Sequence, residues 1–224
     1  MTASGTFGSG AEYAEFVDLN KLGAVVTKGV ANVPWPGNPT PRVAEVYGGM
    51  LNAVGLQNPG IDLFVERDIP FLKQFDTKIM VNVCGHSTEE YIEVVERLRD
   101  QPVDLLEINI SCPNVKEGGI AFGQDPKAVE AITKEMKKHA AQPVIMKLSP
   151  NVTDITEMAR AAEAGGADGL SLINTITGMK IDINRQKFVL ANKTGGMSGP
   201  AIHPVAVRMV YQTAQAVSIP IVGM

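Results

Sequence analysis

Six short apolar runs recur along the chain, and segments with a different pattern separate them. The runs cover residues 24–28, 79–84, 105–111, 144–148, 169–174 and 219–223. Most of them are continuously apolar rather than alternating, which is typical of parallel strands that are covered on both faces. The pattern therefore predicts six strands of a parallel sheet.

Four of the intervening segments carry helix signals. After the second run, for example, Ile92, Val95 and Leu98 share one helical face. The signals that start these helices are a capping box at Ser87 and Glu90, Asp125 followed by Pro126, Thr153 or Asp154, and Pro204. Strands that alternate with helices predict an α/β fold with right-handed crossovers.

The polar residues at the ends of the strands favour a closed barrel over an open, doubly wound sheet. Lys28, Asn82, Asn109, Lys147 and Asn174 each lie at or near the C-terminal end of a predicted strand. In a (β/α)8 TIM barrel these ends meet around one site, whereas in an open sheet only a few of them would meet. A Gly-x-Gly-x-x-Gly motif does not follow the first strand, which weakens the dinucleotide-binding alternative.

We expect one domain over residues 1–224, and we expect its barrel to be incomplete. Six strands are clear where a barrel has eight. The chain starts in what resembles the loop after a strand, and it stops at 219–224 within a strand-to-loop junction. The prediction is a barrel whose first strand is shortened and whose last strand is missing.

Two long segments interrupt the alternation of strands and helices. Residues 29–60 are rich in proline and glycine, residues 175–200 contain several glycines, and neither has a helix or strand period. Ordered loops of this length in compact domains are usually functional. We therefore expect both segments to be loops at the site.

Composition excludes several classes of function. The net charge is −4 and aromatic residues make up 5% of the chain, which argues against a nucleic-acid or anionic membrane surface. Two cysteines do not make a disulfide framework or a zinc site, and no carboxylate pair or metal-ligand cluster stands out. Without an 18-residue apolar run or a signal-peptide pattern, the prediction is a cytoplasmic protein.

Cys112 is the main candidate for chemistry. It lies between Ser111 and Pro113 at the end of an apolar strand, where a thiol can act as a general base or as a nucleophile. None of the three histidines lies in a segment that resembles an active-site loop, so a Cys–His pair is poorly supported. The alternative is an inert buried cysteine, which is the interpretation we keep for Cys84.

Two lysines and several asparagines would surround this thiol. Lys28 and Lys147 lie in or next to apolar strands, where a lysine side chain points either to an electron-rich ligand or along a strand edge to solvent. Converging carboxamides suit a planar polar ring, although each one alone could be a turn or cap residue. The set is Asn52, Asn82, Asn109, Asn114 and Asn174. Glu107 is interpreted as an outward or barrel-bottom residue.

Four motifs resemble the dihydroorotate dehydrogenase family over essentially the whole chain. They are Asn109-Ile110-Ser111-Cys112-Pro113-Asn114, Lys147-Leu148-Ser149-Pro150-Asn151-Val152, Ile173-Asn174-Thr175 and the run from Asn52 to Gly60. The segment 190–201, LANKTGGMSGPA, resembles the class 1B catalytic subunit in particular.

This resemblance implies an FMN enzyme that oxidises (S)-dihydroorotate to orotate in pyrimidine synthesis. Cys112 would remove the C5 proton while the C6 hydride goes to the flavin. The implied substrate residues are Lys28, Asn52, Ala53, Val54, Gly55, Leu56, Asn109, Asn114, Asn174 and Thr175. The implied FMN residues are Ser4, Lys28, Gly29, Asn82, Asn109, Lys147, Ile173 and Gly199.

The class 1B resemblance also implies partners. A homodimer of catalytic subunits would join a second subunit that carries FAD and a 2Fe–2S cluster and passes electrons to NAD. Two other functions stay open at this point. One is a flavin barrel like that of dihydropyrimidine dehydrogenases, which share a Ser-Cys-Pro run, and the other is an inactive fragment that only binds partners.

Overall fold

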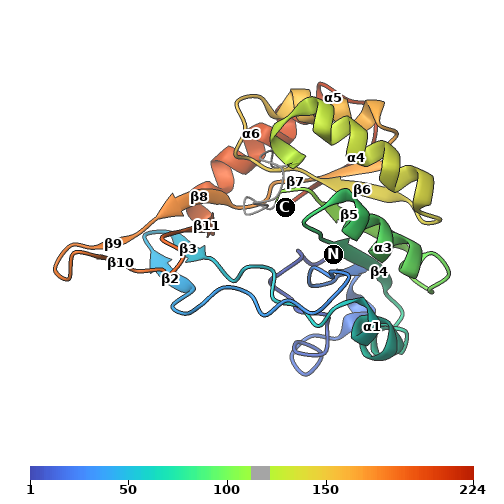
Figure 1. The fold of residues 1–224 in the computed structure, drawn as a ribbon, viewed down its shortest axis with the longest axis horizontal. Helices are drawn as coiled ribbons and strands as arrows, with labels where there is room; N and C mark the ends of the chain where they lie inside the picture. The colour runs from blue at the N-terminus through green and yellow to red at the C-terminus, as the bar shows by residue number, and fades with distance from the viewer. Residues whose placement is uncertain (112–121) are drawn as a thin grey trace.

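A parallel sheet of six strands forms the centre of the computed structural model, which describes residues 1–111 and 122–224 (Figure 1). The strands lie side by side in chain order: β1 (Ala24–Val26), β4 (Lys78–Val83), β5 (Leu105–Asn109), β6 (Val144–Lys147), β7 (Gly169–Leu172) and β12 (Ile221–Gly223). Every neighbouring pair is parallel. All six strands predicted from the apolar runs are confirmed.

Helices cover the outer face of this sheet (Figure 1). They are α3 (Thr88–Leu98), α4 (Pro126–His139), α5 (Ile155–Ala164) and α6 (His203–Ala214), with short 3₁₀ turns at η1 (Leu19–Lys21), η3 (Phe122–Gln124) and η4 (Pro200–Ile202). Ser87 caps α3 through Glu90 N, Asp125 caps α4, and Asp154 rather than Thr153 caps α5. These side chains satisfy amide groups that the first helical turn leaves without partners.

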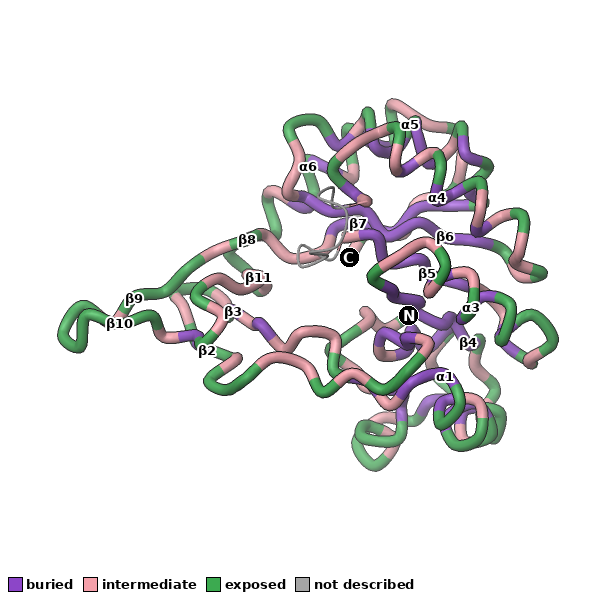
Figure 2. Tube along the Cα trace, viewed as in Figure 1, coloured by how far each residue is buried: buried purple, intermediate pink, exposed green. Residues whose placement is uncertain are grey.

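The core lies between the sheet and these helices, where Figure 2 shows continuous burial. Leu106 and Ile108 of β5 point outward into it and are fully buried, together with Val94 and Val95 of α3. A second, smaller apolar cluster lies on the opposite, inner face of the sheet and joins Val26, Met80, Leu105 and Ile145. A curled parallel sheet that packs apolar side chains on both faces and has helices outside it is part of a (β/α)8 barrel, as predicted.

Parts of the two long segments that were expected to be loops form an antiparallel arm, whereas residues 53–57, for example, form a loop as expected. Strands β2 (Val43–Val46), β3 (Gly49–Asn52), β11 (Thr194–Ser198) and β8 (Ile176–Met179) make a sheet in that order, and β9 (Ile181–Asp182) pairs with β10 (Lys187–Phe188). Figure 1 shows the arm projecting away from the barrel. The expectation was wrong because these strands are two to five residues long and β3 pairs with a strand far along the chain, so local patterns do not reveal them.

A helical segment after Gly60 also escaped the sequence patterns. It comprises α1 (Ile61–Leu63), a π turn η2 (Phe64–Asp68) and α2 (Ile69–Leu72). Its buried apolar positions are Ile61, Phe64, Ile69 and Leu72. A π turn adds one residue to the repeat, so the spacing of these positions departs from the 3.6-residue period of an α-helix.

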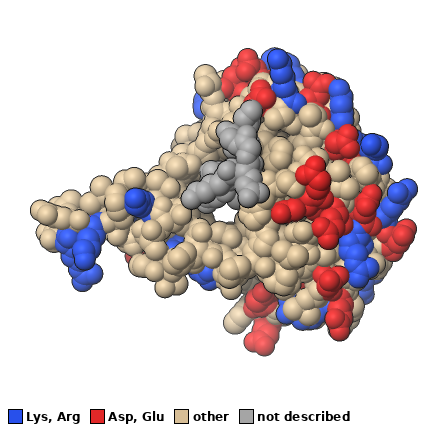
Figure 3. All heavy atoms as spheres, in the orientation of Figure 1, with Lys and Arg blue, Asp and Glu red and all other residues tan. Residues whose placement is uncertain are grey.

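Charged side chains gather over the helices in the view of Figure 3. Within residues 1–111 and 122–224, no helix is long and apolar enough to cross a membrane.

Candidate active site

A layer of buried polar side chains crosses the inner face of the barrel, directly above the inner apolar cluster. The strand register sets Asn82 of β4 beside Glu107 of β5, and Lys147 of β6 beside Ser171 of β7. All four side chains are buried. Because side chains alternate along a strand, residues two positions further along these strands face the same way and continue the layer toward the C-terminal ends.

Glu107 joins the members of this layer. Its Oε2 accepts a 2.6 Å hydrogen bond from Asn82 Nδ2, and its Oε1 accepts a 2.7 Å bond from Ser171 Oγ. The Lys147 ammonium lies 3.8 Å from Oε1. The sequence interpretation of Glu107 as outward or barrel-bottom was wrong, because its position two residues before Asn109 places it on the same inner face.

Both candidate lysines are withdrawn from solvent. Lys147 is 4% exposed, and burial lowers the pKa of its ammonium while the charge of Glu107 acts in the opposite sense. Lys28 follows β1 and is half-buried, and burial is also the main reason that its pKa is lowered. Neither lysine is a solvated side chain at a strand edge, the alternative that the sequence left open.

Asn109 is the centre of a carboxamide cluster at the end of β5. Its Oδ1 accepts hydrogen bonds from Ser111 Oγ (2.6 Å) and Asn174 Nδ2 (3.4 Å), and its Nδ2 donates to Asn82 Oδ1 (3.5 Å). Asn174 Nδ2 also contacts Ser111 Oγ. Tyr91 of α3 also fixes the backbone of Asn109. The Tyr91 hydroxyl donates a 2.6 Å hydrogen bond to the Asn109 carbonyl oxygen.

The segment before β1 brings Ser4 to the same place. Ser4 Oγ accepts a 3.3 Å hydrogen bond from Asn82 Nδ2. Gly29 lies on the other side of Asn82, and a Cβ added there would come within 3.1 Å of Asn82 Oδ1 and 3.4 Å of Leu56 Cδ2. The backbone at Gly29 therefore runs close to the polar layer and to the loop that contains Leu56.

Asn58 supports the predicted substrate loop, Asn52 to Leu56. Its Nδ2 donates to Leu56 O at 2.8 Å, and its Oδ1 accepts from Ala31 N at 3.1 Å and Gly60 N at 2.9 Å. Leu56 has φ = 52°, a value that side chains other than glycine rarely adopt. The buried side chain of Asn58 thus connects Leu56, with its unusual backbone conformation, to Ala31, which follows shortly after Lys28 and Gly29.

The arm links two further substrate candidates, Asn52 in β3 and Thr175 just after β7, through Gly196 of β11. Asn52 Nδ2 donates to Gly196 O at 3.4 Å. A Cβ at Gly196 would collide with Thr175 Oγ1, so glycine allows Thr175 and β11 to pack together. Ile173, just after β7, is buried.

Gly199 is an FMN candidate that the structure describes away from the polar layer. It has φ = 116°, and a Cβ there would lie 2.7 Å from Gly49 Cα. The contact that explains glycine at this position is therefore with the β2–β3 hairpin. Its predicted contact with FMN stays a prediction.

Two candidates lie outside the described residues, namely Cys112 and Asn114.

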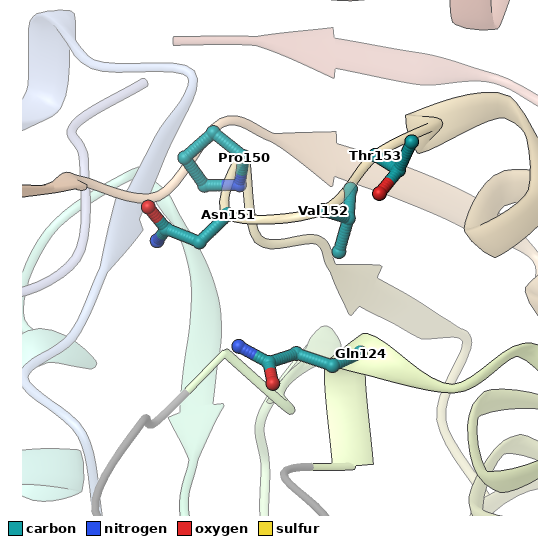
Figure 4. A pocket seen from close by; sticks show the side chains of 5 residues that line it. All are labelled: Gln124, Pro150, Asn151, Val152 and Thr153. Atoms are coloured by element: carbon teal, nitrogen blue, oxygen red, sulfur yellow. The ribbon is translucent and has the colours of Figure 1, made fainter.

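A hollow lies beside the loop that follows β6. It is lined by Gln124, Pro150, Asn151, Val152 and Thr153 (Figure 4). Asn151 also supports the neighbouring strand, because it donates to Thr175 O at 3.0 Å and accepts from Thr177 N at 2.9 Å. This hollow is lined by the loop after β6 rather than by the polar layer.

The chemistry of the polar layer fits a flavin. A buried cation at Lys147 suits the electron-rich edge of a flavin, and the carboxamides of Asn82 and Asn109 both donate and accept hydrogen bonds. The absence of a side chain at Gly29 leaves room for the Asn82 carboxamide, whose Oδ1 would lie 3.1 Å from a Cβ there. Within the described ranges, His, Cys, Asp and Glu form no cluster that could hold a metal ion.

A partial (β/α)8 barrel with this donor set has the characteristics of a flavin-dependent oxidoreductase. The sequence model of the family described as dihydroorotate dehydrogenase matches residues 1–224. The chain belongs to the dihydroorotate dehydrogenase family, and the prediction from its motifs is confirmed.

Relatives with curated names give the same result. The dihydroorotate dehydrogenase B (NAD(+)) catalytic subunit of Lachnoclostridium phytofermentans is 76% identical over 223 residues, and that of Alkaliphilus metalliredigens is 68% identical over 224 residues. Each comparison covers 100% of this chain and 74% of the relative. A crystal structure of the Eimeria tenella enzyme in complex with ferulenol matches with a TM-score of 0.74 at 19% identity, over 99% of this chain and 68% of that one, which supports the fold.

Proposed function

We propose that the chain oxidises (S)-dihydroorotate to orotate with FMN as its cofactor and Cys112 as its base. The observation that carries the proposal is the continuous set of contacts across the inner face. It runs from Ser4 through Asn82, Glu107 and Asn109 to Asn174. Cations and carboxamides fixed in such a layer can hold a flavin and a ring substrate in a defined relative orientation.

The two sets of binding residues divide this layer between cofactor and substrate. The FMN residues are Ser4, Lys28, Gly29, Asn82, Asn109, Lys147, Ile173 and Gly199. The dihydroorotate residues are Lys28, Asn52 to Leu56, Asn109, Asn114, Asn174 and Thr175. Lys28 and Asn109 belong to both sets because cofactor and substrate rings would meet beside them.

Each protein group then has a physical task. Cys112 takes the C5 proton of dihydroorotate, and a thiolate rather than a thiol is the competent form. Asn109 and Asn174 orient the ring through carboxamides that are already fixed by their mutual hydrogen bond. FMN, when bound, supplies the acceptor for the C6 hydride.

We further propose that electrons leave through a partner. A homodimer of this chain would join two copies of a subunit that carries FAD and a 2Fe–2S cluster and reduces NAD. The support is the printed name of the relatives, which contains both "NAD(+)" and "catalytic subunit".

A comparison of substrates tests the assignment. The FMN-loaded chain is mixed anaerobically with dihydroorotate or with dihydrouracil, and loss of the flavin's visible absorbance is followed. Reduction by dihydroorotate at a far higher rate supports the proposal. Preferential reduction by dihydrouracil would transfer the assignment to the dihydropyrimidine dehydrogenase type, and uptake of FMN without reduction by either would leave only a binding function.

Replacing Asn58 by aspartate should weaken dihydroorotate binding more than it slows turnover. The change keeps the size and the acceptor for Ala31 N and Gly60 N, but it turns the donor toward Leu56 O into a second oxygen. A lost buried hydrogen bond costs about 1–3 kcal/mol. We therefore expect KM for dihydroorotate to rise about tenfold with a smaller change in kcat. Steady-state kinetics measure both constants.

The matched control for this change is Asn20→Asp, which alters an exposed asparagine in η1 at the other end of the barrel. Its KM should equal that of the unmodified chain. An unchanged KM in Asn58→Asp would show that Leu56 does not need this support.

A further inference from the structure

We propose that Glu107 is a positioning residue that holds the Lys147 ammonium on the inner face of the barrel and keeps it protonated there. Glu107 has no role in the proton and hydride transfers described above. It is nevertheless 0% exposed in the middle of the polar layer. A buried carboxylate at such a place requires compensating partners, which identify what it does.

The carboxylate is itself held from two sides. Asn82 Nδ2 donates to Oε2 at 2.6 Å from β4, and Ser171 Oγ donates to Oε1 at 2.7 Å from β7. Hydrogen bonds to both oxygens fix the orientation of the carboxylate. The same Oε1 lies 3.8 Å from Lys147 Nζ, so a fixed negative charge lies next to the ammonium.

Among the described side chains, Glu107 is the charged one that acts on Lys147. Ser171 lies opposite Lys147 in the register of β6 and β7, and Met224 brings its thioether against Nζ from the end of β12. Burial lowers the pKa of Lys147, and Glu107 is what acts against that effect. Removing the carboxylate charge would leave burial unopposed and favour the neutral amine.

The consequence for catalysis rests on the proposed function. If FMN binds this layer, the Lys147 ammonium would stabilise negative charge that develops on it. In this arrangement Glu107 would act on a bound flavin through the groups that it holds, Lys147 and Asn82, and not by contact. The role of Glu107 can therefore be measured without any flavin present.

The test is the titration of Lys147 in the ligand-free chain. NMR of the lysine ε-methylene groups, assigned by comparison with Lys147→Met, follows the protonation of Lys147 as the pH is raised. In Glu107→Gln the midpoint should fall by about one pH unit or more, the shift expected from losing an opposite charge within 4–6 Å. An unchanged midpoint would overturn the proposal.

Asp104→Asn is the matched control. Asp104 lies just before β5 and pairs with Lys78 at 2.9 Å, at the far end of the strands from Lys147. This change removes a paired carboxylate from the same sheet, and it should leave the Lys147 midpoint where it was. A similar fall in both variants would show a general effect of charge, which also contradicts the proposal.

A cycle of unfolding experiments keeps the proposal testable if Glu107→Gln folds poorly. Lys147→Met leaves the buried carboxylate without its cation, whereas the double change Glu107→Gln/Lys147→Met removes both charges. The double variant should therefore unfold at a higher denaturant concentration than Lys147→Met. Additive losses would show that the two residues are not coupled. Failure of the chain to bind FMN would contradict the proposed function and leave both of these results unaffected.

Discussion

Replacing Cys112 by serine is expected to slow reduction of the bound flavin by dihydroorotate about 10²–10⁴-fold near neutral pH, the range that general base catalysis contributes. A hydroxyl is nearly isosteric with a thiol but is a far weaker acid, so almost none of it is ionised at this pH. Stopped-flow measurement of the flavin absorbance gives the rate of the step directly.

The pH dependence of this rate separates a base from a nucleophile. If Cys112 removes a proton, the rate of the unmodified chain should rise with pH until the thiol is ionised, and a free thiol has a pKa of about 8.5. Cys112→Ser should continue to gain rate above that range. A covalent adduct between Cys112 and substrate, detected by mass spectrometry, would contradict the role as base.

Cys84→Ala is the control for the other thiol. Cys84 is buried in the segment after β4 and has no part in the proposed proton transfer. Its replacement should change the rate of flavin reduction much less than Cys112→Ser does. Equal losses in the two variants would remove the reason for assigning the base to Cys112.

Replacing Asn109 by alanine is expected to lower kcat/KM for dihydroorotate about 10- to 100-fold. The change leaves Ser111 Oγ and Asn174 Nδ2 without their shared acceptor and removes the donor to Asn82. Loss of a buried partner costs about 1–3 kcal/mol, and here it also releases the orientation of Asn174. Steady-state kinetics give kcat/KM, and fluorescence titration gives the accompanying loss of FMN affinity.

Asn20→Ala provides the comparison for this variant, because it removes an exposed asparagine at the opposite end of the strands. It should keep both the kinetics and the FMN affinity of the unmodified chain. An Asn109→Ala variant with unaltered kcat/KM would show that the carboxamide cluster does not contact the reacting rings.

The barrel strands could be predicted because each one carries its own signal. A strand such as β5, buried on both faces, reads as a continuous apolar run, and a cap such as Ser87 marks the next helix by local chemistry. Asn82, Asn109 and Asn174 could be expected to lie close together, because each of them lies at or near the end of a predicted strand. The contacts among them follow from the topology of the sheet.

Features that depend on distant partners were not predicted. The pairing of β3 with β11 joins Asn52 to Gly196, and neither strand has enough residues to show a period. Glu107 was misplaced although its two-residue spacing from Asn109 gives its face of the strand, and the neighbours that satisfy its carboxylate come from other strands. Asn58 was missed for a similar reason, since the groups that it holds come from both sides of a loop.

The central claim is that the inner face of this barrel binds FMN and lets dihydroorotate reduce it. Anaerobic titration of the FMN-loaded chain with dihydroorotate tests this claim most directly. The account predicts that the visible flavin absorbance is lost and that one orotate forms for each flavin reduced. A chain that binds FMN and keeps its full absorbance with excess dihydroorotate, or one that does not bind FMN, would contradict it.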